Sequence, residues 1–183
     1  MKMLPYMIVS IPIYLLIRFN YIKRNKKFIN LYHEFALAIL SVFTVGLLSQ
    51  TIIPKYIFEN GKIVIIKSGF HETNLIPFKV IIETYIETFV NKNINYFLIN
   101  FLGNIIMFIP FGFIIPLLWN ISNKKVIIIG FSISLFIEMC QLFLIRGTDI
   151  DDLMLNTLGV VVGLLIYKSL TKKCYNVFNK YKY

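Results

Sequence analysis

The fold is decided by the stretch from Tyr96 to Trp119, which reads YFLINFLGNIIMFIPFGFIIPLLW and holds no charged residue. An α-helix rises about 1.5 Å per residue, so about 20 apolar residues cross the hydrocarbon core of a bilayer. The composition of the whole chain also indicates a membrane protein, because 57% of its 183 residues are hydrophobic and its mean hydropathy is +0.72. A soluble domain rarely carries so apolar a composition, and we therefore predict an integral membrane protein.

Further apolar runs lie on both sides of this stretch, and they predict spans at Met3–Phe19, Leu31–Ile53, Val126–Ile145 and Leu153–Leu170. Together the runs predict an all-α, polytopic helical bundle of about five transmembrane helices, a single membrane domain over residues 1–183. Pro5 and Pro12 predict a kink or tilt in the first span. A cleaved signal peptide is the alternative there, but the positive charges follow this run and no small-residue cleavage site appears.

The charged residues predict the orientation of the bundle. The 19 lysines and arginines outnumber the 9 acidic residues, and they concentrate at Tyr21–Asn30, at Lys124–Lys125 and in the tail after residue 170. With five spans these segments fall on one side, which the positive-inside rule assigns to the cytoplasm. We therefore expect a multi-pass cell-membrane protein with its N-terminus outside and its C-terminus in the cytoplasm. Membrane lipids are the expected partners, and nucleic acid is not, because topology accounts for the lysines.

The segment between the second and third spans has a structure of its own. Asn60-Gly61 lies between the apolar stretches of residues 56–66, which predicts a short extracytoplasmic β-hairpin. Further on, apolar residues repeat at helical spacing and predict an amphipathic helix. Such a helix either lies on the outer leaflet or packs on the transmembrane bundle. Its apolar positions are Phe78, Ile81, Ile82, Tyr85, Ile86, Phe89 and Val90.

Polar residues gather at one depth of the predicted bundle. The third and fifth spans run inward from the outer face and the fourth runs outward, so the outer parts of all three come together. A turn joins the fourth span to the fifth at the same face. The candidate site residues at this depth are Asn100, Asn104, Glu138, Gln141, Arg146, Asp149, Asp152 and Asn156.

Small residues share helical faces with these polar groups. The Gly159-xxx-Gly163 pair allows another backbone to approach closely, and the expected helix-packing positions are Gly103, Gly112, Gly159 and Gly163. The polar and small faces should point at one another, because an unpaired polar group facing lipid costs several kcal/mol.

Two interpretations of the polar residues remain open. In one, Glu138, Arg146 and their neighbours form a hydrogen-bonded staple that holds the bundle together. In the other, the same groups line a pocket for a polar headgroup at the outer face. Cys140 and Cys174 lie at different depths and predict no disulfide, and no Cys/His spacing suits a metal. We expect neither a metal nor a cofactor.

Three segments resemble the signatures of VanZ-like proteins. They are NFLGNIIMFIPFG at 100–112, Glu138-Met-Cys-Gln141 followed by Arg146, Asp149, Asp152, Asn156 and Gly159, and Asn74-Leu-Ile-Pro-Phe78. The resemblance covers about residues 74–165. It implies a bacterial membrane protein like the name-giving member, which lowers susceptibility to the lipoglycopeptide teicoplanin. It also implies that the motif positions are site residues, without assigning them roles.

Two functions follow as hypotheses. The first is a non-enzymatic protein whose outer polar site binds, or alters access to, an envelope lipid, a cell-wall lipid precursor or the antibiotic. The second is a membrane enzyme acting on a lipid headgroup, with Glu138, Asp149 and Asp152 holding a cation or serving as acid and base, joined by His71. No nucleophile motif favours the enzyme. A transporter subunit is disfavoured because the sequence shows no inverted repeat.

Overall fold

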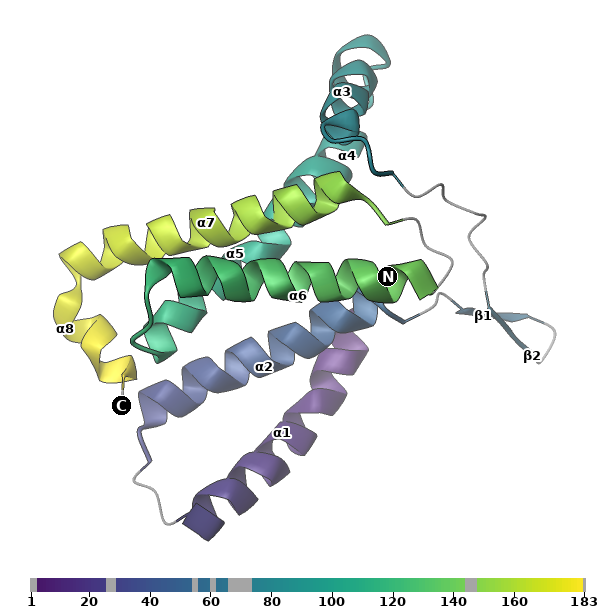
Figure 1. Cartoon of the computed structure of the whole chain (residues 1–183). Coiled ribbons are helices and arrows are strands. Elements are labelled where there is room, and N and C mark those ends of the chain that lie inside the picture. Colours follow the sequence, from purple (N-terminus) through teal and green to yellow (C-terminus); the bar gives the residue numbers. More distant parts are fainter. Residues whose placement is uncertain are drawn as a thin grey trace.

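A computed structural model of the chain describes residues 3–25, 29–53, 56–59, 62–65, 74–143 and 148–182. Within these residues five helical stretches are long and apolar enough to cross a membrane (Figure 1). The predicted polytopic helical bundle is therefore confirmed. The five stretches are Met3–Asn25, Leu31–Thr51, Ile94–Leu118, Asn123–Leu142 and Ile150–Lys173.

The elements follow one another along the chain as the apolar runs predicted, with shifts of a few residues at most boundaries. The largest shift is in the first helix, which continues through Pro12 to Asn25. Lys23 and Arg24 lie in its last turn, where positive charge interacts favourably with the helix dipole. In order the elements are α1 (Met3–Asn25), α2 (Leu31–Thr51), β1 (Tyr56–Glu59), β2 (Lys62–Ile65), α3 (Lys79–Tyr85), the π-helix η1 (Ile86–Val90), α4 (Ile94–Tyr96), the π-helix η2 (Phe97–Leu102), α5 (Gly103–Leu118), α6 (Asn123–Phe143), α7 (Ile150–Lys173), α8 (Tyr175–Phe178) and η3 (Asn179–Tyr181).

Helices α5 and α7 form the tightest part of the core. A Cβ atom built at Gly159 or Gly163 would collide with a backbone carbonyl of α5, and one built at Gly112 would collide with the carbonyl of Val160 on α7. Small residues on both helices thus allow the two backbones to touch. Gly103 is different, because a Cβ there would meet nothing closer than the Leu98 carbonyl at 3.5 Å, an ordinary contact.

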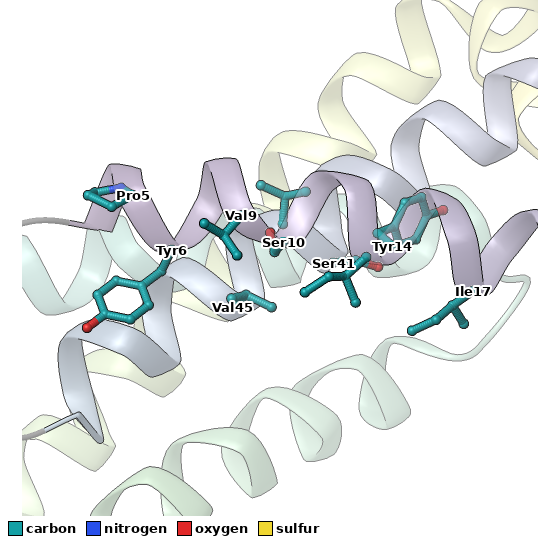
Figure 2. A pocket seen from close by; sticks show the side chains of 10 residues that line it. Pro5, Tyr6, Val9, Ser10, Tyr14, Ile17, Ser41 and Val45 are labelled. Atoms are coloured by element: carbon teal, nitrogen blue, oxygen red, sulfur yellow. The ribbon is translucent and has the colours of Figure 1, made fainter.

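Helix α1 packs on α2 at the periphery of the bundle (Figure 1). A fork-like ion pair joins the two helices, with Arg18 Nε 2.5 Å from Glu34 Oε2 and the second guanidinium nitrogen 2.6 Å from Oε1. Further along, a groove of about 640 Å³ runs between the two helices, and Figure 2 shows that residues of both helices line it.

The basic segments gather at one end of the bundle. The C-terminal tail folds back on the start of α2, where the Asn30 side-chain amide donates to the carbonyls of Lys180 (2.9 Å) and Lys182 (3.0 Å). His33 Nδ1 lies 2.9 Å from the carbonyl of Tyr181. The turn between α5 and α6 lies at the same end (Figure 1). The prediction that this end faces the cytoplasm rests on the positive-inside rule.

The hairpin and the amphipathic helix lie beyond the opposite end (Figure 1). Strands β1 and β2 pair antiparallel, with Tyr56 opposite Ile65 and Glu59 opposite Lys62, and the predicted hairpin is therefore confirmed. Its Asn60-Gly61 turn lies outside the described residues. The α3–η1 helix buries Thr84, which is 5% exposed, but leaves the side chains of Lys79 and Glu83 43% exposed. Its apolar side is open, with Phe89 71% exposed. Its apolar face is thus not packed on the described part of the bundle.

Candidate functional site

The start of α7 is tied to the segment that leads into α3. The backbone N–H of Asn74 donates to the Thr148 carbonyl at 2.9 Å, and the Asn74 carbonyl accepts from the N–H of Ile150 at 3.1 Å. The Asn74 side-chain amide also donates to Asp149 Oδ1 at 3.0 Å. Segments 75 residues apart in sequence are thereby held side by side.

Asp151 holds the start of α3. Its carboxylate is 2% exposed and accepts two backbone N–H groups, from Phe78 at 2.6 Å and from Val80 at 2.7 Å. Hydrogen bonds to a charged acceptor are about twice as strong as neutral ones. They hold Phe78 in a left-handed conformation with φ 67°, which an L-residue with a large side chain rarely adopts.

Glu138 joins α6 to the turn before α7. It is 4% exposed, and its Oε2 accepts the backbone N–H of Asp149 at 3.1 Å, while its own carbonyl accepts the Thr148 hydroxyl at 3.1 Å. Asp149 in turn caps α7 by accepting the N–H of Asp151 at 2.9 Å. Burial raises the pKa of the Asp149 carboxyl above its ordinary value, and the hydrogen bonds from Asp151 and Asn74 act in the opposite direction.

Asp152 and Asn156, which lie one helical turn apart on α7, each form a hydrogen bond to a neighbouring helix. The Asn104 amide on α5 donates to Asp152 Oδ1 and, at 3.1 Å, to the carbonyl of Asn100. Deeper in the bundle, the Asn156 amide donates to the hydroxyl of Ser134 on α6 at 2.9 Å. Ser134 is fully buried and Asn156 is 5% exposed, so this pair lies within the core of the membrane domain.

The structure sorts the predicted site residues into three groups. Asn104, Glu138, Asp149, Asp152 and Asn156 each make a side-chain hydrogen bond to another segment of the bundle, and the Asn100 carbonyl accepts from Asn104. The Gln141 amide lies instead 3.3 Å from the carbonyl of Thr51 on α2. The third group is Arg146 alone, which lies outside the described residues.

The list of candidate site residues drawn from the sequence left out Asp151, which lies in the turn at the same depth, and Ser134, and gave Asn74 only as part of a motif. The signal for Asp151 was its place in the first turn of a helix, next to two other aspartates. We call the interlocked groups near the start of α7 the polar cluster, comprising Asn74, Asn104, Glu138, Asp149, Asp151 and Asp152.

The polar cluster is rich in hydrogen-bond acceptors. Among the described residues, no Lys, Arg or His nitrogen lies within ion-pair distance of its carboxylates, since the ion pairs there are Arg18–Glu34 and Lys79–Glu83. Its carboxylates are held by backbone and side-chain N–H groups instead. Glu138 Oε1 and Asp152 Oδ2 accept no hydrogen bond from the described residues. A ligand that completes the cluster would therefore offer N–H or O–H donors.

Comparison with known proteins gives the family. A family model described as VanZ/LLP1 matches residues 35–172. The chain belongs to the VanZ/LLP1 family. The match begins within α2, ends near the end of α7, and thus contains the whole polar cluster, which confirms the resemblance seen in the sequence motifs. No curated protein and no solved structure matches the chain.

Proposed function

We propose that this VanZ/LLP1 protein acts at the extracytoplasmic face of the bacterial cell membrane and lowers susceptibility to teicoplanin-type lipoglycopeptide antibiotics. Its polar cluster binds an envelope lipid, a cell-wall lipid precursor or the antibiotic, or alters access to it. The observation that carries the proposal is the polar cluster itself, in which carboxylates from α6 and α7 have acceptor atoms without a partner among the described residues, at one end of a membrane bundle.

The surroundings of the cluster support a ligand that is part polar and part apolar. The amphipathic α3–η1 helix is attached to Asp151 and exposes apolar side chains, with Ile82 60% and Tyr85 63% exposed. A surface of this kind inserts into the headgroup boundary of a membrane. A lipid or lipoglycopeptide reaching the cluster therefore meets apolar side chains for its acyl chain and acceptors for its donors.

The test uses a bacterium in which the chain raises teicoplanin resistance. Glu138→Gln removes the negative charge but keeps an oxygen that can accept the N–H of Asp149. Asp152→Asn likewise removes the charge and keeps an oxygen that can accept the Asn104 amide. We expect both variants to lose most of the protection at normal protein levels in the membrane. Glu87→Gln is the matched control, because Glu87 is a carboxylate on η1 that bonds only to the nearby Asn91 amide at 2.9 Å among the described residues.

Protection that survives both cluster substitutions, with protein levels equal to those of the unsubstituted chain, would remove the polar cluster from the mechanism. The enzymatic alternative is separated by mass spectrometry of the membrane lipids with and without the protein. A binding protein leaves the lipids chemically unchanged, whereas an enzyme acting on a headgroup leaves a modified lipid whose amount falls in the Glu138→Gln strain.

A further inference from the structure

Two hydroxyl groups on the inner side of the α3–η1 helix have no hydrogen-bond partner in the part of the chain that the structure describes. Thr84 is 5% exposed, and the Oγ1 atoms of both Thr84 and Thr88 are buried without a partner among the described residues. The two residues are four apart and therefore lie on the same face of the helix. A buried hydroxyl without a partner costs about 1–3 kcal/mol, so a pair of them needs an explanation.

The other helical threonines of the described chain behave differently. Each donates to the carbonyl four residues earlier, at distances of 2.7 to 2.9 Å. This local bond is the usual way in which a helix satisfies a threonine hydroxyl. The threonines that make it are Thr44, Thr51, Thr157 and Thr171. Thr84 and Thr88 are thus the exceptions among the helical threonines of the described residues, and both lie on the α3–η1 helix.

The segments around the two hydroxyls form a polar seam. Helix α3 packs on η2 and on α7, and η1 packs on α4. Across this seam the hydroxyl of Tyr96 donates to Glu83 Oε2 at 3.0 Å. Lys79 is engaged with the same carboxylate at 3.8 Å. Glu83 and Glu87 place two carboxylates beside the one lysine, Lys79, that is paired here among the described residues. This excess of carboxylates disfavours a phosphate and favours a neutral ligand with hydroxyl groups.

The opposite side of the same helix indicates where such a ligand comes from. Ile82, Ile86 and Phe89 are 60%, 44% and 71% exposed, so the helix presents an apolar surface on its outer side. A ligand that reaches the seam beside this surface is an amphiphile held in the membrane. Threonine hydroxyls both donate and accept, as sugar hydroxyls do.

We propose that Thr84 and Thr88, on the seam between α3–η1 and η2, bind the sugar hydroxyls of a membrane glycolipid. This site lies on a different helix from Glu138 and Asp152, although both proposals use the exposed apolar face of α3–η1 for an acyl chain. It does not require that the chain protect against an antibiotic.

The test is a competition between two lipids with identical acyl chains. The full chain, purified in detergent, is incubated with equal amounts of a glucosyl-diacylglycerol and a phosphatidylglycerol, and bound lipids are counted by native mass spectrometry. We expect the unsubstituted chain to prefer the glucosyl lipid. The Thr84→Val/Thr88→Val variant, which replaces each hydroxyl by a methyl of similar size, should lower the ratio of glucosyl lipid to phosphatidylglycerol about tenfold.

Two controls separate this proposal from simple effects on folding and from the proposed function. Thr157→Val/Thr171→Val removes two hydroxyls that are already bonded to carbonyls, and should leave the ratio unchanged. In the teicoplanin assay, Thr84→Val/Thr88→Val should leave the protection unchanged, so that the two proposals fail separately. If the Thr84→Val/Thr88→Val variant does not accumulate, Thr88→Val alone and Thr84→Ser, which keeps its hydroxyl, are compared in the same way.

The proposal is overturned if the unsubstituted chain shows no preference for the glucosyl lipid, or if Thr84→Val/Thr88→Val keeps the preference in full. A second outcome also overturns it. If the variant unfolds at a higher temperature than the unsubstituted chain, and the difference is the same with either lipid, the two hydroxyls are buried without any ligand.

Discussion

Asp151 offers the sharpest test of how the site is built. Its buried carboxylate accepts the N–H groups of Phe78 and Val80, and no other described side chain holds the start of α3 in this way. We predict that Asp151→Asn loosens α3 while leaving the membrane helices in place. The substituted amide keeps one acceptor oxygen, but it turns an NH₂ group toward the second backbone N–H, so at least one of the two bonds is lost.

The size of the effect follows from these bonds. A hydrogen bond to a charged group contributes about 1.5–3 kcal/mol. The same bonds also have to offset the cost of the left-handed conformation of Phe78 at φ 67°, which is roughly 1–2 kcal/mol. Losing one bond should therefore raise the population of an opened α3 start by about 10- to 100-fold, since about 1.4 kcal/mol corresponds to a factor of ten.

Hydrogen–deuterium exchange measures this population directly. In the Asp151→Asn variant, peptides covering Phe78 and Val80 should exchange about 10- to 100-fold faster, while peptides from α5 and α7 keep their protection. Asp152→Asn is the control, because Asp152 is the next residue but bonds to Asn104 on α5. Unchanged exchange at Phe78 and Val80 in Asp151→Asn, or equal acceleration in Asp152→Asn, would refute the assignment of Asp151 as the residue that holds α3.

Two further predictions concern packing and backbone conformation, and both are measured by thermal unfolding in detergent. Gly163→Ala should lower the unfolding temperature clearly, because its Cβ would collide with the carbonyl of Ile109. Gly103→Ala should leave the unfolding temperature nearly unchanged, because its Cβ would lie 3.5 Å from the Leu98 carbonyl oxygen. Equal effects of the two substitutions would contradict the close α5–α7 crossing. Lys92→Gly should stabilise the protein by up to about 1 kcal/mol, because Lys92 has φ 55° in the turn between η1 and α4, and a lower unfolding temperature would argue against that conformation.

The membrane helices were predictable because their signal is contained in single apolar runs. Each run of about 20 apolar residues has few ways to satisfy its backbone in a bilayer other than as a helix. The predicted depth of the polar residues followed from the alternating direction of the spans. Asn104, Glu138 and Asp152 accordingly meet at one end of the bundle.

The pairing of these residues was not predictable, because it depends on how each helix is rotated about its axis. Asp151 and Asp152 are adjacent, yet successive helical residues point about 100° apart. One carboxylate therefore faces α3 and the other faces α5. For the same reason Gln141, which shares a helix with Glu138, reaches α2 instead of the polar cluster. Rotation is decided by the contacts of the whole bundle.

The amphipathic helix shows a different limit. The spacing of its apolar residues predicted the helix correctly. It did not decide whether the apolar face lies on a membrane surface or packs against the protein. The structure buries Val80 and Thr84 and exposes Ile82, so most of the apolar face points away from the described part of the bundle. The deciding contact is the carboxylate of Asp151, far away in sequence, which fixes the rotation of α3 at its first turn.

The first turn of α7 thus serves several elements at once. Acidic side chains are favourable at the N-terminus of a helix, where the dipole is positive, so this turn can hold three of them close together. Each bonds to a different partner: Asp149 to Asn74, Asp151 to the α3 backbone, and Asp152 to Asn104. Asn104 occupies Asp152 Oδ1, and Oδ2 accepts no hydrogen bond from the described residues, so a donor at Oδ2 would meet a carboxylate that α5 already holds in place. The carboxylates that we propose bind the ligand are thus the same ones that hold α3, α5 and the start of α7 together.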